Sequence, residues 1–407
     1  MKTLVFEGDI KKIAATLVLS KISKRAFNLN CSPISFKTYK EEPLPKDNWI
    51  KVRNIQTGIC GSDMTFYTCA QSMTTAMYPI PCSDITFLGH ETVGVVSEVG
   101  KNVKHIKVGD RVVLKEYMQC CDIKGYDVED FCENCKNGEY TICSNYGEDS
   151  KVTTPTGAGF GDYYIGPETK VIKIDDHITD DQAVIIEPCA VSLHSVMKKI
   201  PEVNDKVLVI GGGMIGLNII QCIKLLQPNC EVHVMERVKE KQDFAKRLGA
   251  DFIVDCDPYE YVAKHTNAKL YKKGKYKMLL GGFDIIYDTV GKHGIFNDAI
   301  RWIKARGTYV KVGYQMTNVT FDETPIWWQE INIIGVDSYG METYNGERIQ
   351  SFDLVVKLLN EGKLNFDGFI THRFKLSEYK KGFSQCLRKP HETIKVVLEN
   401  DLDVFKK

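Results

Sequence analysis

Three segments of the chain carry side chains that are able to bind a metal ion. Cys60 lies in GICGSD, the adjacent His90 and Glu91 lie in FLGHETVG, and Glu187 lies in IIEPCAV. A thiolate, an imidazole and carboxylates suit Zn²⁺, and a catalytic zinc site keeps one position open for water or substrate. Spacing alone leaves another interpretation open, because a single cysteine is often a small buried residue and a His-Glu pair often lies on the surface.

The cysteines are the one unusual feature of the composition. The 407 residues include 14 cysteines, and five of these fall between Cys120 and Cys143. Such clustering favours a metal site over disulfide bonds, and Cys132-x-x-Cys135 followed by Cys143 is a good zinc pattern. The alternative is a set of free or buried thiols without a metal.

A glycine-rich turn predicts a dinucleotide-binding site. An apolar strand over 206–210 runs into Gly211-Gly-Gly213-Met214-Ile215-Gly216, and a helix-like segment follows. Here the first glycine permits a tight turn, the second lets a pyrophosphate approach the backbone, and the third allows close packing of helix and strand. The helix N-terminus adds N–H groups and partial positive charge.

The residue at the end of the next strand favours NAD over NADP. Glu236 lies 20 residues after Gly216, at the end of the segment EVHVM. An acid at this position accepts hydrogen bonds from the ribose hydroxyls and repels a 2′-phosphate. Arg237 is next in the chain and would tolerate some NADP.

The pattern of elements predicts two domains of different kinds, as the chain length also suggests. From about 49 to 173, short strand-like runs are separated by turn residues, which is typical of a mostly β domain. From about 179 onward, apolar strands alternate with helix-like segments. This alternation favours a parallel sheet covered by helices, and the fold class is therefore α/β.

Taken together, the motifs resemble the zinc-dependent medium-chain alcohol dehydrogenases. CGSD, GHETVGVVSEVG, GDRV, Glu187-Pro188 and GGGMIG occur in the family's order, within about 49–400. The resemblance implies a GroES-like, β-rich catalytic domain over 1–178, with a structural zinc lobe at about 119–144. A Rossmann domain with a doubly wound parallel sheet would follow over 179–345. Residues 346–407 would return to the first domain.

The resemblance also assigns roles at the catalytic site. It implies zinc bound by Cys60, His90 and Glu187, with Glu91 at or near the metal. Ser62 matches the hydroxyl that relays the proton of the alcohol. Many relatives carry a histidine where this chain has Thr65, so the route from Ser62 to solvent could use water, a ribose hydroxyl or Glu91.

A second, structural zinc ion is implied for the cysteine lobe. Cys132, Cys135 and Cys143 match three of its four ligands. The usual spacing places the remaining ligand at Glu129, whereas counting from GDRV places it at Cys120, with about nine residues inserted after it. We take Cys120 as the first choice and Cys121 as the second.

These features predict an NAD-dependent zinc enzyme that reversibly oxidises a secondary alcohol to a ketone. A glutamate at 187 resembles the polyol, sugar and threonine dehydrogenase branches, so a polyol, sugar or cyclitol is expected. A threonine 3-dehydrogenase is the nearest alternative. Others are a catalytically inert nucleotide-binding sensor or structural subunit, and a protein that holds NAD tightly for redox-neutral chemistry. The retained metal-binding residues argue against an inert protein.

Charge and hydropathy limit the partners. Lys+Arg and Asp+Glu both number 53, so no basic excess points to nucleic acid. There is no signal-peptide pattern and no run near the ~20 apolar residues of a spanning helix, so we expect a cytoplasmic protein with no membrane partner. A homodimer or homotetramer is expected. The segment at about 10–35 is an insertion relative to the family, without an assigned role; it could cover the substrate cleft or an oligomer interface. Trp327-Trp328 lies near a place where relatives often make subunit or substrate contacts, but such a pair is more often packed, and we expect it to be packed here.

Overall fold

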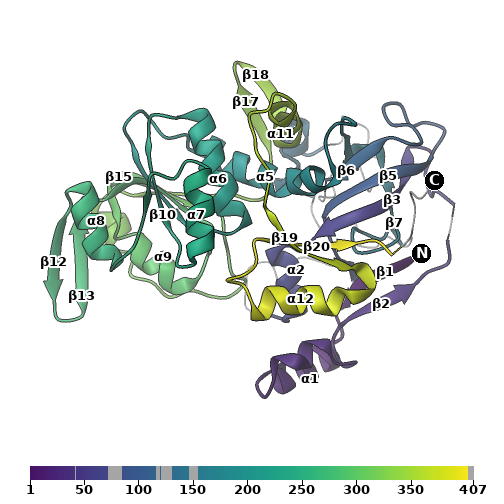
Figure 1. Ribbon diagram of the computed structural model, residues 1–407, viewed down its shortest axis with the longest axis horizontal. Helices are drawn as coiled ribbons and strands as arrows, with labels where there is room; N and C mark the ends of the chain where they lie inside the picture. Colours follow the sequence, from purple (N-terminus) through teal and green to yellow (C-terminus); the bar gives the residue numbers. More distant parts are fainter. Residues whose placement is uncertain (42, 72–84, 116–119, 121–130, 146–154, 402–407) are drawn as a thin grey trace. The chain divides into compact units, whose positions relative to one another are not determined.

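The chain forms two compact units in the computed structural model (Figure 1). The structure describes residues 1–41, 43–71, 85–115, 120, 131–145 and 155–401. The first unit comprises Met1–Glu187 with Asn365–Lys407, and the second comprises Pro188–Leu364. These boundaries lie later in the chain than the expected ones at 178/179 and 345/346. Helix α5 (Asp180–Lys198) contains the first of them.

The first unit is built on a largely antiparallel sheet in which strands from its N-terminal and C-terminal segments pair. Its strand order among the described residues is β19-β20-β3-β5-β6-β8, with β7 also paired to β3. Strand β20 pairs with β3 through Val397 and Gly58, so the C-terminal segment is part of this sheet. The strands are β3 (Trp49–Gly58), β5 (Glu91–Val99), β6 (Arg111–Leu114), β7 (Tyr163–Pro167), β8 (Val171–Lys173), β19 (Ile370–Lys375) and β20 (Lys395–Glu399).

A smaller sheet and several helices complete the first unit. In the order β2-β1-β4, strand β1 (Lys2–Glu7) pairs with β2 (Ile34–Thr38) and β4 (Ile85–Phe87). A shared core cluster includes Phe6, Phe27, Tyr67, Phe160 and Phe383. The helices are α1 (Ile10–Ser20), η1 (Lys24–Asn28), α2 (Gly61–Tyr67), α4 (Glu133–Lys136), η3 (Tyr140–Ile142), η4 (Glu168–Lys170), η5 (Leu376–Glu378) and α12 (Tyr379–Arg388).

The second unit confirms the predicted doubly wound parallel sheet. Its strand order is β11-β10-β9-β14-β15-β16, which is the order typical of a Rossmann fold. The strands are β9 (Lys206–Ile210), β10 (Glu231–Met235), β11 (Phe252–Ile253), β14 (Phe283–Asp288), β15 (Ile303–Lys311) and β16 (Asn332–Gly335). Helices α6 (Met214–Leu226), α7 (Lys239–Arg247), α8 (Pro258–Thr266), α9 (His293–Ala299) and α10 (Thr324–Trp328) connect them.

Two hairpins extend the second unit beyond its parallel sheet. The first joins β12 (Lys269–Lys273) to β13 (Tyr276–Leu280), and the second joins β17 (Met341–Tyr344) to β18 (Glu347–Gln350), before α11 (Ser351–Asn360). The second hairpin and α11 belong to this unit, which moves its C-terminal boundary to Leu364.

Two expectations about apolar residues have different outcomes. Trp327 and Trp328 are 79% and 57% exposed, so the expectation that this pair is packed is wrong; the short α10 leaves both rings at the surface. Among the described residues, no helix combines the length and the apolar character that crossing a membrane requires.

Candidate metal and dinucleotide sites

The structure brings together three of the side chains that the sequence singled out. Cys60 immediately precedes α2, His90 immediately precedes β5, and Glu91 is the first residue of β5. One donor atom from each lies within 4.8 Å of the others; His90 and Glu91 are buried and Cys60 is partly buried. A sulfur, an imidazole nitrogen and a carboxylate oxygen at this spacing fit the donor chemistry of Zn²⁺.

A buried aspartate fixes the backbone of both segments. The Asp63 carboxylate accepts a hydrogen bond from the Cys60 N–H at 2.9 Å and another from the Gly89 N–H at 3.3 Å. Asp63 is buried in the first turn of α2. One side chain therefore sets the spacing between the residue that carries the thiol and the residue before the imidazole. We did not predict this role, although Asp63 belongs to the CGSD motif.

Glu187 lies near this group without being a member of it. Its side chain is buried on α5, but the donor atoms that lie within 4.8 Å of one another belong to Cys60, His90 and Glu91. Glu187 does contribute to the electrostatic environment of Lys395, a residue close to Glu91. Its role as a metal ligand stays a prediction.

Lys395 forms a buried ion pair with Glu91. Its ammonium group lies 2.6 Å from Oε1 of Glu91, makes a second contact to Oε2, and donates to the Ile59 carbonyl at 3.1 Å. Glu91 lies opposite Gly58 on β3, where a Cβ atom would come within 2.1 Å of the carboxylate. The pair therefore depends on a residue without a side chain at position 58.

The ion pair determines the charge of Lys395. Burial alone lowers the pKa of its ammonium group, but the Glu91 carboxylate, with contributions from Cys60 and Glu187, raises that pKa above its usual value. Lys395 is therefore a cation and balances the charge of Glu91. We did not predict this residue, because a single lysine in TIKVVLEN resembles an ordinary surface lysine.

The four cysteines of the lobe also converge. The sulfur atoms of Cys120, Cys132, Cys135 and Cys143 all lie within 4.8 Å of one another. The Cys120–Cys143 and Cys132–Cys143 sulfur distances are 3.4 and 3.8 Å, too long for disulfide bonds. A tetrahedron with Zn–S bonds of about 2.3 Å has edges of about 3.8 Å. The alternatives for Cys120, namely Cys121 and Glu129, lie outside the described residues.

N–H groups contact two of the sulfur atoms in this lobe. The Asn145 amide donates to the Cys120 sulfur at 3.2 Å, and the Cys135 N–H donates to the Cys132 sulfur at 3.5 Å. Burial acts to raise the pKa of Cys132, but backbone N–H groups of Cys135 and Ser144 lower it to about 6. Burial raises the pKa of Cys143. Four sulfurs this close, one of them acidic, fit a closed structural zinc site.

The glycine turn has the geometry that a pyrophosphate site needs. Gly211 has a φ of +102°, and a Cβ atom at Gly216 would lie 1.9 Å from the Gly211 carbonyl oxygen. A Cβ atom at Gly213 would meet nothing within 4 Å, so the backbone is open there. Met214 and Ile215 begin α6 directly after Gly213.

The acid at the end of β10 lies against this turn. Glu236 accepts hydrogen bonds from the N–H of Gly212 at 2.9 Å and from the N–H of Arg237 at 2.7 Å. Arg237 itself is exposed. Lys241 on α7 also lies within electrostatic range: burial lowers its pKa, and the Glu236 carboxylate opposes that shift. We did not predict Lys241, which is a second basic residue close to Glu236.

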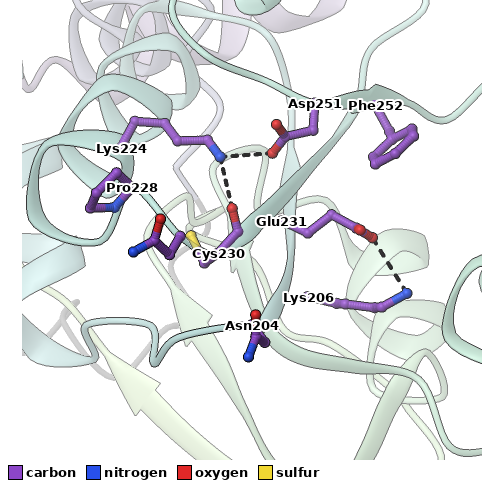
Figure 2. Close-up of a pocket in the computed structure, with 9 residues that line it drawn as sticks. Asn204, Lys206, Lys224, Pro228, Cys230, Glu231, Asp251 and Phe252 are labelled. Atoms are coloured by element: carbon purple, nitrogen blue, oxygen red, sulfur yellow. Dashed lines mark hydrogen bonds and ion pairs between the residues drawn. The ribbon is translucent and has the colours of Figure 1, made fainter.

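A cavity of about 650 Å³ lies at the other end of the same sheet (Figure 2). It is lined by the first residues of three strands, Lys206, Glu231 and Phe252. Its charges are paired: Lys224 contacts Asp251 at 2.8 Å, and Lys206 lies 3.4 Å from Glu231. Dinucleotides bind beyond the carboxyl ends of parallel strands, so this cavity is not the cofactor site.

Comparisons with known proteins agree with this architecture. A family model described as "Alcohol dehydrogenase GroES-like domain" matches residues 46–176, and one described as "Zinc-binding dehydrogenase" matches residues 215–356. The chain is 28% identical over 366 residues to D-arabitol-phosphate dehydrogenase of Enterococcus avium, covering 89% of this chain and 93% of that protein. It is 26% identical to sorbitol dehydrogenase of Halalkalibacterium halodurans, covering 88% and 94%.

Two solved structures have the same fold as this chain. An alcohol dehydrogenase of Escherichia coli CFT073, complexed with NADH, has a TM-score of 0.72 at 23% identity, covering 98% of this chain and 99% of that one. A zinc-binding dehydrogenase from Sinorhizobium meliloti 1021, bound to NADP, has a TM-score of 0.68 at 23% identity, covering 90% and 96%.

The two matched family models and the named relatives together define a dehydrogenase. The chain belongs to the zinc-binding, medium-chain alcohol dehydrogenase family, together with the polyol dehydrogenases among its relatives.

We expect Lys395→Met to lower the free energy of unfolding by about 3–5 kcal/mol, because the buried Glu91 side chain would lose its ion-pair partner. Chemical unfolding measures this value. Lys375→Met is the matched control: Lys375 pairs with Glu399 at 2.9 Å but is exposed, so its loss costs less than about 1 kcal/mol. Adding Glu91→Gln to Lys395→Met should restore more than half of the loss. Equal effects of the two lysine substitutions would contradict the prediction.

Proposed function

We propose that the protein is a zinc- and NAD-dependent dehydrogenase that reversibly oxidises a secondary alcohol of a polyol, sugar or cyclitol to a ketone. The observation that carries this proposal is the close group of Cys60, His90 and Glu91 donor atoms, in a chain that also has the glycine turn. The relatives named for arabitol phosphate and sorbitol support the substrate class.

Cys60, His90 and Glu187 are the proposed ligands of the catalytic metal. When bound, Zn²⁺ supplies polarisation of the alcohol oxygen and NAD supplies the acceptor for the hydride. Both oxygens of Glu91 contact Lys395, which supports a place for Glu91 beside the metal rather than among its permanent ligands. Asp63 holds the thiol and imidazole segments in register through its two backbone hydrogen bonds.

Ser62 is the proposed first acceptor of the proton of the alcohol. It lies in the first turn of α2, two residues after Cys60, and is partly buried. The Thr65 hydroxyl donates to the Gly61 carbonyl at 3.2 Å and is thereby engaged with the helix backbone. Since Lys395 contacts both oxygens of Glu91, a ribose hydroxyl or water is the favoured next carrier after Ser62.

The dinucleotide would bind at the start of α6. Gly211, Gly213 and Gly216 shape the turn, and the N–H groups of the first turn of the helix would face the pyrophosphate. Glu236 would exchange its hydrogen bond from Gly212 for the ribose hydroxyls, which favours NAD. Arg237 and Lys241 supply the positive charge that would allow weaker use of NADP.

Two further assignments complete the proposal. The lobe cysteines would bind a second, structural zinc ion. A homodimer or homotetramer is supported by the edge strand β16, which pairs on one side only among the described residues, and by the exposed Trp327 and Trp328 that precede it.

Cys60→Ser should reduce turnover by about a thousandfold or more while NAD still binds, because a metal ligand is lost and the dinucleotide turn is untouched. Turnover is followed by NADH absorbance with sorbitol, arabitol, xylitol, inositol, butanediol and threonine as substrates, and NAD binding by calorimetry. Cys256→Ser removes an exposed cysteine and serves as the control. Unchanged turnover in Cys60→Ser would refute the zinc mechanism, and activity with threonine alone would replace the substrate class.

Glu236→Gln should raise the ratio of NADP to NAD specificity, measured as kcat/KM, by about tenfold, because the repulsion of a 2′-phosphate is removed. Lys241→Ala should lower NADP use in that background. Glu240→Gln, a nearby exposed acid on α7, is the control and should leave the ratio unchanged. If Glu236→Gln and Glu240→Gln behave alike, Glu236 does not select the cofactor.

Metal analysis should find two zinc ions per chain. Cys135→Ser should retain one ion and unfold at a lower temperature, because the lobe loses the metal that closes it. Cys60→Ser should also retain one ion, but with a smaller change in unfolding temperature. A wild-type protein with one zinc ion, kept in Cys135→Ser, would mean that the lobe binds no metal.

A further inference from the structure

The inserted segment at the N-terminus has an unusual distribution of charge. Residues 10–40 contain seven lysine and arginine residues and no aspartate or glutamate, although the whole chain has equal numbers of both signs. The segment forms α1, η1 and β2. A segment whose charged side chains are all positive, in a protein with no net charge, points to a negatively charged partner.

One face of α1 is fixed to the body of the first unit. Thr16 is fully buried, and its hydroxyl donates to the Cys31 carbonyl at 3.1 Å. Ile13 packs against the core cluster that contains Phe6 and Phe27. Asp9 caps the helix through the Lys11 N–H at 2.8 Å. The helix is therefore formed and oriented before any partner arrives.

The opposite face of α1 is apolar and exposed. Ile10 is 74% exposed, Val18 is 62% exposed, and Ile22, just beyond the helix, is 83% exposed. Ala14 and Leu17 lie between them on the same face. Aliphatic side chains at i, i+4 and i+8 form a continuous stripe. A stripe of this kind, with polar residues around it, marks an interaction site.

Unpaired cations lie at both ends of this stripe. Lys11 lies at its start, and Lys21, Lys24 and Arg25 lie at its end. All four are exposed, and none contacts an acidic side chain among the described residues. Lys12, by contrast, points away from the stripe and pairs with Glu7. Lysine and arginine at the ends of an apolar stripe can extend their charged groups outward while their stems stay on apolar surface.

We propose that α1 and the residues up to Arg25 bind the surface of an anionic phospholipid bilayer, with the helix in the plane of the interface. Ile10, Leu17, Val18 and Ile22 would enter the boundary between head groups and acyl chains, and the four cations would contact lipid phosphates. This contact is peripheral and reversible, because α1 has only 11 residues. It reverses the expectation, drawn from the absence of a spanning segment, that the protein has no membrane partner.

The charge favours a bilayer over a second copy of the chain. Two copies joined through this face would bring the same four cations together, and residues 10–40 contain no acid to offset them. An anionic surface offsets all four at once and also accepts the apolar stripe. The bilayer is therefore the occupant that satisfies both features.

The full-length protein tests this proposal in flotation assays with phosphatidylcholine vesicles that contain 30% or no phosphatidylglycerol. We expect binding to the anionic vesicles only, weakening as salt rises. Lys21→Gln/Lys24→Gln/Arg25→Gln should weaken binding by about tenfold or more, and Val18→Glu/Ile22→Glu should abolish it. Dehydrogenase activity in solution should be unchanged in both variants, which shows that they are folded.

A second basic surface provides the matched control. Lys269→Gln/Lys273→Gln/Lys275→Gln removes the same number of charges from the exposed β12–β13 hairpin and should leave vesicle binding unchanged. Equal loss in the hairpin variant would mean general electrostatic adsorption and would overturn the proposal. So would a wild-type protein that stays with the soluble fraction. A change of oligomeric mass in Val18→Glu/Ile22→Glu, with vesicle binding intact, would assign the stripe to a second copy instead.

Discussion

The ion pair between Lys395 and Glu91 is the interaction on which the catalytic unit depends. Lys395 begins β20, Glu91 begins β5, and Gly58 of β3 leaves the space between them. Two charges taken this far from water are tolerated only when each satisfies the other. The pair therefore couples the position of β20 to the close group of Cys60, His90 and Glu91. An error in the seating of β20 would directly disturb the site.

Around this pair, backbone hydrogen bonds and sheet register also position the donor residues. Asp63 accepts hydrogen bonds from the N–H groups of Cys60 and Gly89, and the sheet register places Glu91 opposite Gly58. The cysteine lobe follows a different principle: among its described residues, the four cysteines form most of the apolar cluster, together with Phe131 and Tyr140. The sheet positions the group of Cys60, His90 and Glu91, whereas the four cysteines themselves hold together the loop that carries them.

The parts of the structure that the sequence predicted are those in which neighbouring residues determine the geometry. The strand–turn–helix at Gly211–Gly216 is of this kind, and so is the C-x-x-C pattern of Cys132 and Cys135. We did not predict the role of Lys395, because its partner Glu91 lies 304 residues away in the chain. The exposure of Trp327 and Trp328 and the later unit boundaries depend on packing between elements, which periodicity does not encode. The chosen fourth cysteine, Cys120, lies with the other three.

The pairing of β20 with β3 also has a consequence for how the chain folds during its synthesis. The second unit is one uninterrupted stretch of chain, so all strands of its sheet are available before synthesis ends. It is therefore able to fold co-translationally. The first unit consists of two separate stretches of chain. Its central strand β3 pairs with β20, which is synthesised more than 300 residues later. Pairing across such a distance is slow. Until β20 is made, the end of β3 over Gln56–Gly58 lacks its β20 partner, while Trp49–Arg53 is able to pair with β7. A chaperone would be most useful at this stage.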